Sequence, residues 1–187
     1  MAAIATPPSL PFNWTWFQES ANGLGLRESQ IVSGAFTPSD SEKHLLGLTH
    51  DEIRVLFRQY FHELNEVASL TMIASTEASL RIDFEARTAK RHKDKISREF
   101  RDIRRRRGRW IRLDEDILET WTTVGGTAKS TISEFRGLLN LRDWLAHGRY
   151  WAPKLGKQYD AQGVFSVSDR LLRKLPILSN DSRHRAR

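Results

Sequence analysis

Apolar residues recur at steps of three and four along the middle of the chain, which is the spacing of one face of an α-helix. The first series follows Thr49 and comprises Ile53, Leu56, Phe57, Tyr60, Phe61, Leu64, Val67 and Ala68. Thr49 and Glu52 stand three apart, as in a capping box, and so predict the start of this helix. A second series continues toward residue 106 and comprises Leu80, Phe84, Ile96, Phe100 and Ile103.

No Gly or Pro interrupts residues 51–107, so the pattern predicts a long helix over this range, broken once or twice. Ser75 or Thr76 is expected to cap a second helix or to mark a kink. The basic end of this range is followed by Gly108, where a loop is expected.

Three shorter helices are predicted downstream, over residues 114–121, 127–147 and about 166–175. Thr127 follows the turn at Gly125-Gly126 and is expected to cap the second of them, which Gly148 ends. Ser166 or Ser168 is expected to cap the third, after a loop over residues 149–165. No convincing strand pattern is present, so the sequence predicts an all-α fold.

The first 44 residues differ from the rest because turn-forming residues are frequent there: Pro7, Pro8, Pro11, Pro38, Gly23, Gly25 and Gly34. We expect an irregular N-terminal arm that docks through an aromatic group made of Trp14, Trp16 and Phe17. The expected organisation is an extension over residues 1–44, a helical domain over 45–178, and a disordered basic tail over 179–187.

The amino-acid composition excludes several kinds of reactive and metal-binding site. The 187 residues include no cysteine, which excludes disulfides, thiol nucleophiles and cysteine-bound metal. No apolar run approaches the roughly 20 residues that span a bilayer, and no secretion signal is recognisable, so a cytoplasmic location without membrane contact is expected. The six histidines include no pair three or four apart, and His62 with Glu66 is interpreted as an ordinary surface contact, so no metal or cofactor is expected.

Positive charge is concentrated in one stretch. Residues 87–112 contain thirteen Lys or Arg against three acidic residues, within a chain of net charge +7. The densest part is Arg104, Arg105, Arg106 and Arg107. A solvated helix face is one interpretation and a surface that follows phosphates is the other; the local excess favours contact with nucleic acid.

The helix predicted over residues 127–147 contains an unexpected cation. Its apolar stripe comprises Ile132, Phe135, Leu139, Arg142 and Ala146, so an arginine occupies a position where leucine is expected. Arg142 could pair with Asp143 or Glu134, with His147 stabilising the helix C-terminus. Alternatively, Arg142 and His147 act together on a phosphate. Positions five apart diverge by about 140° on a helix, so Arg142 must reach sideways or a second chain must complete the site.

These residues, Arg142, Asp143 and His147, spell Arg-Asp-x-x-x-His near the end of a helix. The arrangement resembles the Arg-polar-x-x-x-His signature of the HEPN superfamily. Further stretches are similar to bacterial HEPN proteins of the RiboL-PSP type: "STEASLRIDFEAR", "KDKISREFR", "LDEDILETW" and "WLAHGRYWAPKLG". The resemblance spans about residues 49–175.

The resemblance implies a helical bundle that dimerises through the helix carrying Arg142 and His147. It also implies a metal-independent endoribonuclease of a toxin or phage-defence system, with RNA, a second copy and an antitoxin or other protein as partners. A ribose 2′-OH would attack the adjacent phosphodiester and leave a 2′,3′-cyclic phosphate. His147 would be a general acid or base, paired with a second His147 across the dimer, and Arg142 would stabilise the phosphorane. Asp143 would orient Arg142 or His147.

Arg149 lies close to this signature and would hold a neighbouring phosphate, with a solvent-facing arginine as its alternative. Two other functions stay open from the sequence. One is a non-catalytic HEPN module that binds RNA or nucleotide, or scaffolds a partner. The other is a structural helical protein in which Arg142 and His147 are satisfied ions.

Overall fold

The computed structural model describes residues 9–35, 40–90, 92–147 and 159–178, and every regular element in these ranges is helical. The elements are α1 (Leu10–Val32), η1 (Asp40–Leu45), α2 (His50–Ala89), α3 (Lys95–Arg107), η2 (Leu113–Leu118), α4 (Glu119–Thr123), α5 (Lys129–Ala146) and α6 (Ala161–Lys174). Here η1 is a 3₁₀ helix and η2 is a turn of π-helix. The prediction of an all-α fold is confirmed for the described residues. None of these helices is both long and apolar enough to cross a lipid bilayer.

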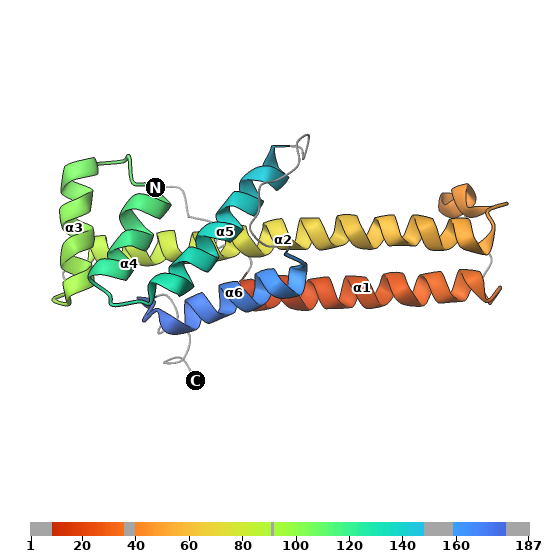
Figure 1. Cartoon of the computed structure of the whole chain (residues 1–187), viewed down its shortest axis with the longest axis horizontal. Coiled ribbons are helices and arrows are strands. Elements are labelled where there is room, and N and C mark those ends of the chain that lie inside the picture. Colours follow the sequence, from red (N-terminus) through yellow and green to blue (C-terminus); the bar gives the residue numbers. More distant parts are fainter. Residues whose placement is uncertain (1–8, 36–39, 91, 148–158, 179–187) are drawn as a thin grey trace.

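The molecule is organised along α2. α1 lies antiparallel beside the N-terminal half of α2, and together they form an elongated two-helix arm (Figure 1). α3, α4, α5 and α6 gather around the other half of α2, and α6 also contacts the start of α1 (Figure 1). The arm therefore reaches beyond the body of the bundle.

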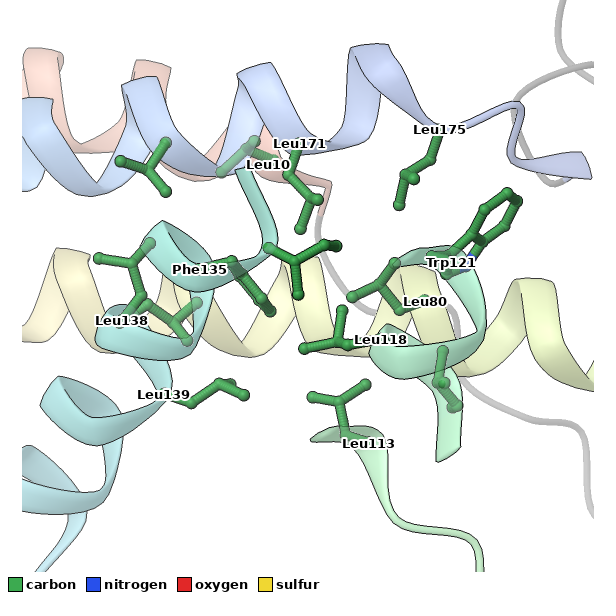
Figure 2. Close-up of a cluster of buried hydrophobic side chains, with 14 of the residues drawn as sticks. Leu10, Leu80, Leu113, Leu118, Trp121, Phe135, Leu138, Leu139, Leu171 and Leu175 are labelled. Carbon is green, nitrogen blue, oxygen red and sulfur yellow. The ribbon is translucent and has the colours of Figure 1, made fainter. Parts of the chain in front are cut away.

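Two hydrophobic clusters hold this arrangement together. The larger one joins α2 to the helices of the body and includes Leu80, Leu113, Leu118, Trp121, Phe135, Leu138 and Leu171 (Figure 2). The smaller one closes the far end of the arm and consists of Ile31, Leu45, Ile53 and Phe57. Burial of these apolar surfaces is the main favourable contribution to folding.

The start of α2 follows the sequence prediction. The Glu52 backbone N–H donates to Thr49 Oγ1 at 3.3 Å, and the Thr49 backbone N–H donates to Glu52 Oε2 at 2.8 Å, which completes the capping box. The expected kink at Ser75 or Thr76 is wrong. Both hydroxyls donate to carbonyls four residues earlier, at 2.9 Å each, and α2 continues through them.

The long predicted helix breaks between α2 and α3, within residues 90–94. The sequence contains no Gly or Pro there, and the break is stabilised by side chains. Asp94 caps α3 by accepting the Ser97 backbone N–H at 2.9 Å. Arg101 donates to the carbonyls of Lys90 (3.3 Å) and His92 (2.9 Å), so the end of α2 is fixed against α3.

The prediction of an irregular N-terminal arm is wrong for residues 10–32, which form α1. Ser9 accepts the Phe12 backbone N–H, and Pro11 lies in the first turn, where a helix needs no donor from it. The prediction that the aromatics dock this segment is confirmed for Trp14. Its ring stacks on Phe165 of α6 with centroids 4.7 Å apart. Trp16, by contrast, is partly exposed.

Two predicted helix starts are also wrong. α5 begins at Lys129, and Thr127 instead donates its backbone N–H to the Trp121 carbonyl. α6 begins at Ala161, so residues 161–165 of the predicted loop are helical. Asp160 caps α6 by accepting the Gly163 N–H at 2.7 Å, and Ser166 lies inside the helix. The predicted tail over residues 179–187 lies outside the described residues.

Candidate catalytic site

α5 supplies the residues predicted to act on a phosphate, and its packing determines where they lie. Its buried residues are Thr131, Ile132, Phe135, Leu138, Leu139 and Leu141, several of which enter the larger cluster (Figure 2). Past Leu141 burial decreases: Trp144 and Leu145 are half-buried, and His147 is exposed. The last turn of α5 therefore extends from the core toward solvent.

Arg142 occupies the apolar stripe, as the sequence predicts, with 32% of its side chain exposed. Its Nη2 lies 3.7 Å from Glu77 Oε2, and its Nε lies 3.2 Å from Asp143 Oδ1. The first separation is too long for a hydrogen bond, and the buried Nε has no aligned acceptor within the described ranges. The positive charge of the guanidinium is therefore balanced by two carboxylates, while its Nε–H donates no hydrogen bond to any described residue. Of the two predicted acidic partners, Asp143 is correct, whereas Glu134 pairs with Arg170.

Glu77 is a site residue that sequence reasoning did not identify. It lies on α2, and its side chain is only 16% exposed. Its Oε1 accepts hydrogen bonds from Arg81 Nε (3.0 Å) and Nη2 (2.9 Å), while its Oε2 faces Arg142. Two arginines therefore share one carboxylate. The sequence carried no signal for this role, because Glu77 and Arg81 are four apart on a helix and form an ordinary pair there.

His147 is the C-cap residue of α5, where the chain leaves helical geometry at φ −95° and ψ 19°. Its backbone N–H donates to the Asp143 carbonyl at 3.1 Å. No hydrogen bond or ion pair to its imidazole ring is found in the described part of the chain.

The three predicted residues lie within one turn and a half of helix; Arg142 and Asp143 form an ion pair, whereas no contact of the His147 side chain with either is found among the described residues. Arg142 turns toward α2, whereas Asp143 is 57% exposed and His147 is exposed. The hollow of about 490 Å³ between α2, α3 and the segment after α6 is lined by other residues. Arg149 lies outside the described residues.

The predicted RNA-binding arginines lie on the last turn of α3, and each has a carboxylate partner. Arg104 pairs with Glu85, Arg105 with Asp102, Arg106 with Glu99 at 3.0 Å, and Arg107 with Asp116 at 3.3 Å. The hydrogen bond from Arg105 holds the pKa of the Asp102 carboxyl below its usual value. The sequence count of thirteen cations therefore overstates the free positive charge.

Arg87, at the start of the basic stretch, faces inward and is a structural residue. Its Nε donates to Asp83 Oδ2 at 2.9 Å, and its Nη1 donates to Asp94 Oδ1 at 3.1 Å and Ser97 Oγ at 3.3 Å. Its Nη2 donates to the Pro176 carbonyl. Burial raises the pKa of the Asp83 carboxyl, and the hydrogen bonds that it accepts offset part of that effect. This network joins α2, α3 and the segment after α6.

The basic end of α3 and the C-terminal end of α5 lie apart in the molecule, with the body of the bundle between them (Figure 1). The structure therefore does not bring Arg104–Arg107 to Arg142 and His147. His62 Nε2 lies 3.4 Å from Glu66 Oε1 on α2; the His62 side chain is exposed, whereas the Glu66 side chain is only 11% exposed. Across the described ranges, no three His, Asp or Glu side chains are grouped as metal ligands would be.

A scan against protein-family models found no match to this chain. Searches of curated proteins and of solved structures found no match either. The fold and the residues at the end of α5 therefore carry the functional argument.

Proposed function

We propose that this protein is a metal-independent endoribonuclease of the HEPN type, acting as a homodimer. One observation carries the proposal: Arg142 lies on the apolar face of α5 with acidic partners and an Nε that has no hydrogen-bond partner among the described residues, and His147 is exposed five positions later. The toxin or phage-defence setting is part of the proposal and is supported by the resemblance of the Arg-Asp-x-x-x-His signature alone.

The chemistry of phosphodiester cleavage fits these side chains. The attacking 2′-OH must lose a proton and the leaving 5′-oxygen must gain one, which a histidine does near neutral pH. Charge grows on the phosphoryl oxygens as the pentavalent state forms. An arginine stabilises that charge because its N–H groups bind two oxygens at once. Asp143 would keep the Arg142 guanidinium oriented.

The need for two proton-transfer groups supports a dimer. Each chain offers one histidine at this position, and Arg142 and His147 diverge along α5. A second copy placed against the end of α5 would supply the second His147. The partly exposed Trp144 and Leu145 beside the site would provide apolar surface for that contact.

The test uses purified wild type and His147→Ala with total tRNA and mixed RNA in EDTA. Product ends are analysed for 2′,3′-cyclic phosphate. His62→Ala is the matched control, since His62 is exposed on a helix surface and has an acidic partner. Cleavage by wild type and His62→Ala, and its loss in His147→Ala, would support the proposal. Equal cleavage by all three would refute the role of His147.

Arg142→Ala has its own control in Arg136→Ala on the same helix. The Arg136 side chain is 38% exposed, against 32% for Arg142, and it pairs with Asp114 and Glu119. Selective loss of cleavage in Arg142→Ala would identify the guanidinium of the site. RNA binding without cleavage by wild type would instead favour the non-catalytic binding module.

A further inference from the structure

One feature of the basic surface is not explained by charge alone. Trp110 follows α3 and is 73% exposed, more than any other large apolar side chain that the structure describes. The other exposed large apolar residues lie on α1, on α2 or between them: Phe12, Trp16, Leu26, Leu46, Val55, Tyr60 and Val67. Trp110 is therefore separated in sequence and element from every other exposed apolar group.

The turn that presents Trp110 is ordered by hydrogen bonds. Gly108 ends α3 with a φ of +60° and donates its N–H to the Arg104 carbonyl at 2.9 Å. The Trp110 backbone N–H donates to the Arg107 carbonyl at 3.0 Å. Three positions later Leu113 is buried in the larger cluster. The indole is thus held outward on a fixed backbone.

Three arginines lie close to Trp110 in sequence, and one of them contacts its indole. The Arg109 guanidinium lies over the Trp110 ring, 5.2 Å from its centroid, and no carboxylate partner of Arg109 is found among the described residues. Arg105 and Arg106 have side chains that are 78% and 68% exposed. Their ion pairs with Asp102 and Glu99 are at the surface, where such pairs are weak and exchange for a phosphate at little cost.

We infer that the turn after α3 binds single-stranded nucleic acid: one base stacks on Trp110, and Arg105, Arg106 and Arg109 hold the flanking phosphates. The inference deepens the proposed function, on which the identification of the strand as RNA rests. An aromatic ring among arginines is the arrangement that binds unpaired bases without regard to sequence. A duplex offers no exposed base face to the indole.

A membrane surface also attracts tryptophan among cations, but the packing of α3 disfavours it. Ile96, Phe100 and Ile103, the apolar residues of α3, are all buried. The helix therefore has no apolar face left for a lipid boundary, and one indole offers little area for membrane insertion.

The test measures binding of a labelled strand of about 12 nucleotides, a length within the usual site sizes, by fluorescence anisotropy. The strand is 2′-O-methyl RNA, which lacks the attacking hydroxyl, so the full-length wild type can be used without cleavage. Trp110→Ala is expected to weaken binding by about 5- to 100-fold, and Trp110→Phe to retain most of it. Leu26→Ala, which removes an exposed side chain on the arm, is the control and should bind as wild type.

Arg105→Ala tests the phosphate contacts. It should reduce the slope of log affinity against log salt by about 0.7, the value for one phosphate of a single strand. Arg173→Ala is the control, because Arg173 is also 78% exposed and also pairs with an aspartate on its own helix. An unchanged slope in Arg105→Ala would show that this arginine makes no contact with a phosphate.

Three results would overturn the inference: unchanged affinity in Trp110→Ala, tighter binding of the annealed duplex than of the strand, and Trp110-dependent binding to phosphatidylserine vesicles without RNA binding. Tighter binding of the DNA strand than of RNA would overturn the identification of the strand as RNA. Failure of the nuclease proposal is distinguished by cleavage. Trp110-dependent binding without any cleavage refutes the nuclease alone, whereas His147-dependent cleavage with normal binding by Trp110→Ala refutes this surface alone.

Discussion

Replacing Arg142 with leucine removes the guanidinium and restores the apolar stripe of α5. We expect the free energy of unfolding to stay within about 1 kcal/mol of wild type. The ion pairs with Glu77 and Asp143 involve partly exposed groups, and such pairs contribute about 0–1 kcal/mol. Leucine and arginine have nearly equal helix propensity. Glu77 is not left without a cation, because Arg81 Nη2 lies 2.9 Å from its Oε1.

The same substitution should abolish function. Removal of one group that stabilises transition-state charge costs about 100- to 1000-fold in rate, or roughly 3–4 kcal/mol. Arg142→Leu should therefore lose cleavage while it unfolds in urea at nearly the wild-type midpoint. Circular dichroism at a series of urea concentrations measures the stability, and the cyclic-phosphate assay measures the rate.

Arg87→Leu is the contrasting variant. Arg87 lies on α2 and Arg142 on α5, and both helices contribute to the larger cluster. Only 5% of the Arg87 side chain is exposed, and its loss leaves the fully buried Asp83 without its cation. Breaking a buried pair in this way costs about 3–5 kcal/mol. If Arg142→Leu were destabilised to that extent, Arg142 would be a structural ion. If Arg142→Leu still cleaved RNA at the wild-type rate, the assignment of Arg142 to the catalytic site would be refuted.

Glu77→Gln should lower cleavage by about 10- to 100-fold through misplacement of Arg142, with little change in urea midpoint; an unaltered rate would exclude Glu77 as a positioning residue. Gly125→Ala should lower the free energy of unfolding by about 1–3 kcal/mol, because the added Cβ would lie 2.7 Å from the Trp121 carbonyl oxygen. The Cβ added in Gly23→Ala meets nothing within 4 Å, so this variant should stabilise α1. Equal melting temperatures of the two variants would contradict this packing. Burial raises the pKa of the Asp94 carboxyl, but hydrogen bonds and a neighbouring guanidinium outweigh it, so the net pKa is lowered. Its stabilising effect is then complete above the ordinary value of about 3.9 and is lost as the pH falls through the lowered value, so Asp94→Asn should be less stable near pH 7 and equal wild type in acid; a difference that grew in acid would have the wrong sign. Cleavage per mole of protein should rise with protein concentration if two chains form the site, and a constant specific activity down to the lowest dilution would count against a dimer that dissociates in that range.

Features that depend on neighbouring residues were predictable from the sequence. The capping box at Thr49 and Glu52 and the apolar period of α2 are local, and both are found as expected. The error at α1 had a local cause as well. Pro11 was interpreted as a helix breaker, although the first helical turn tolerates proline. The break between α2 and α3 has only the helix cap Asp94 as a local marker, and the contacts of Arg101 with the Lys90 carbonyl and of Arg87 with Asp94 cross the corner.

The candidate site shows the same division. Arg142, Asp143 and His147 were identified because they lie within six positions on one helix. Glu77 lies on α2, far away in sequence, and only packing of α5 against α2 brings it to Arg142. The partners of the basic residues were missed for the same reason, since Glu85 reaches Arg104 across the corner between α2 and α3.

Pairing changes what the basic stretch can do. Arg104 and Arg107 face Glu85 and Asp116, and Arg87 is buried, so charge alone no longer distinguishes this surface from a solvated helix face. What distinguishes it is the exposed Trp110 at its end. The C-terminal end of α5 lies apart from this surface in the molecule (Figure 1). An RNA that contacts both must therefore be longer than either site alone would hold, and shortening the strand should reduce cleavage before it reduces binding at Trp110.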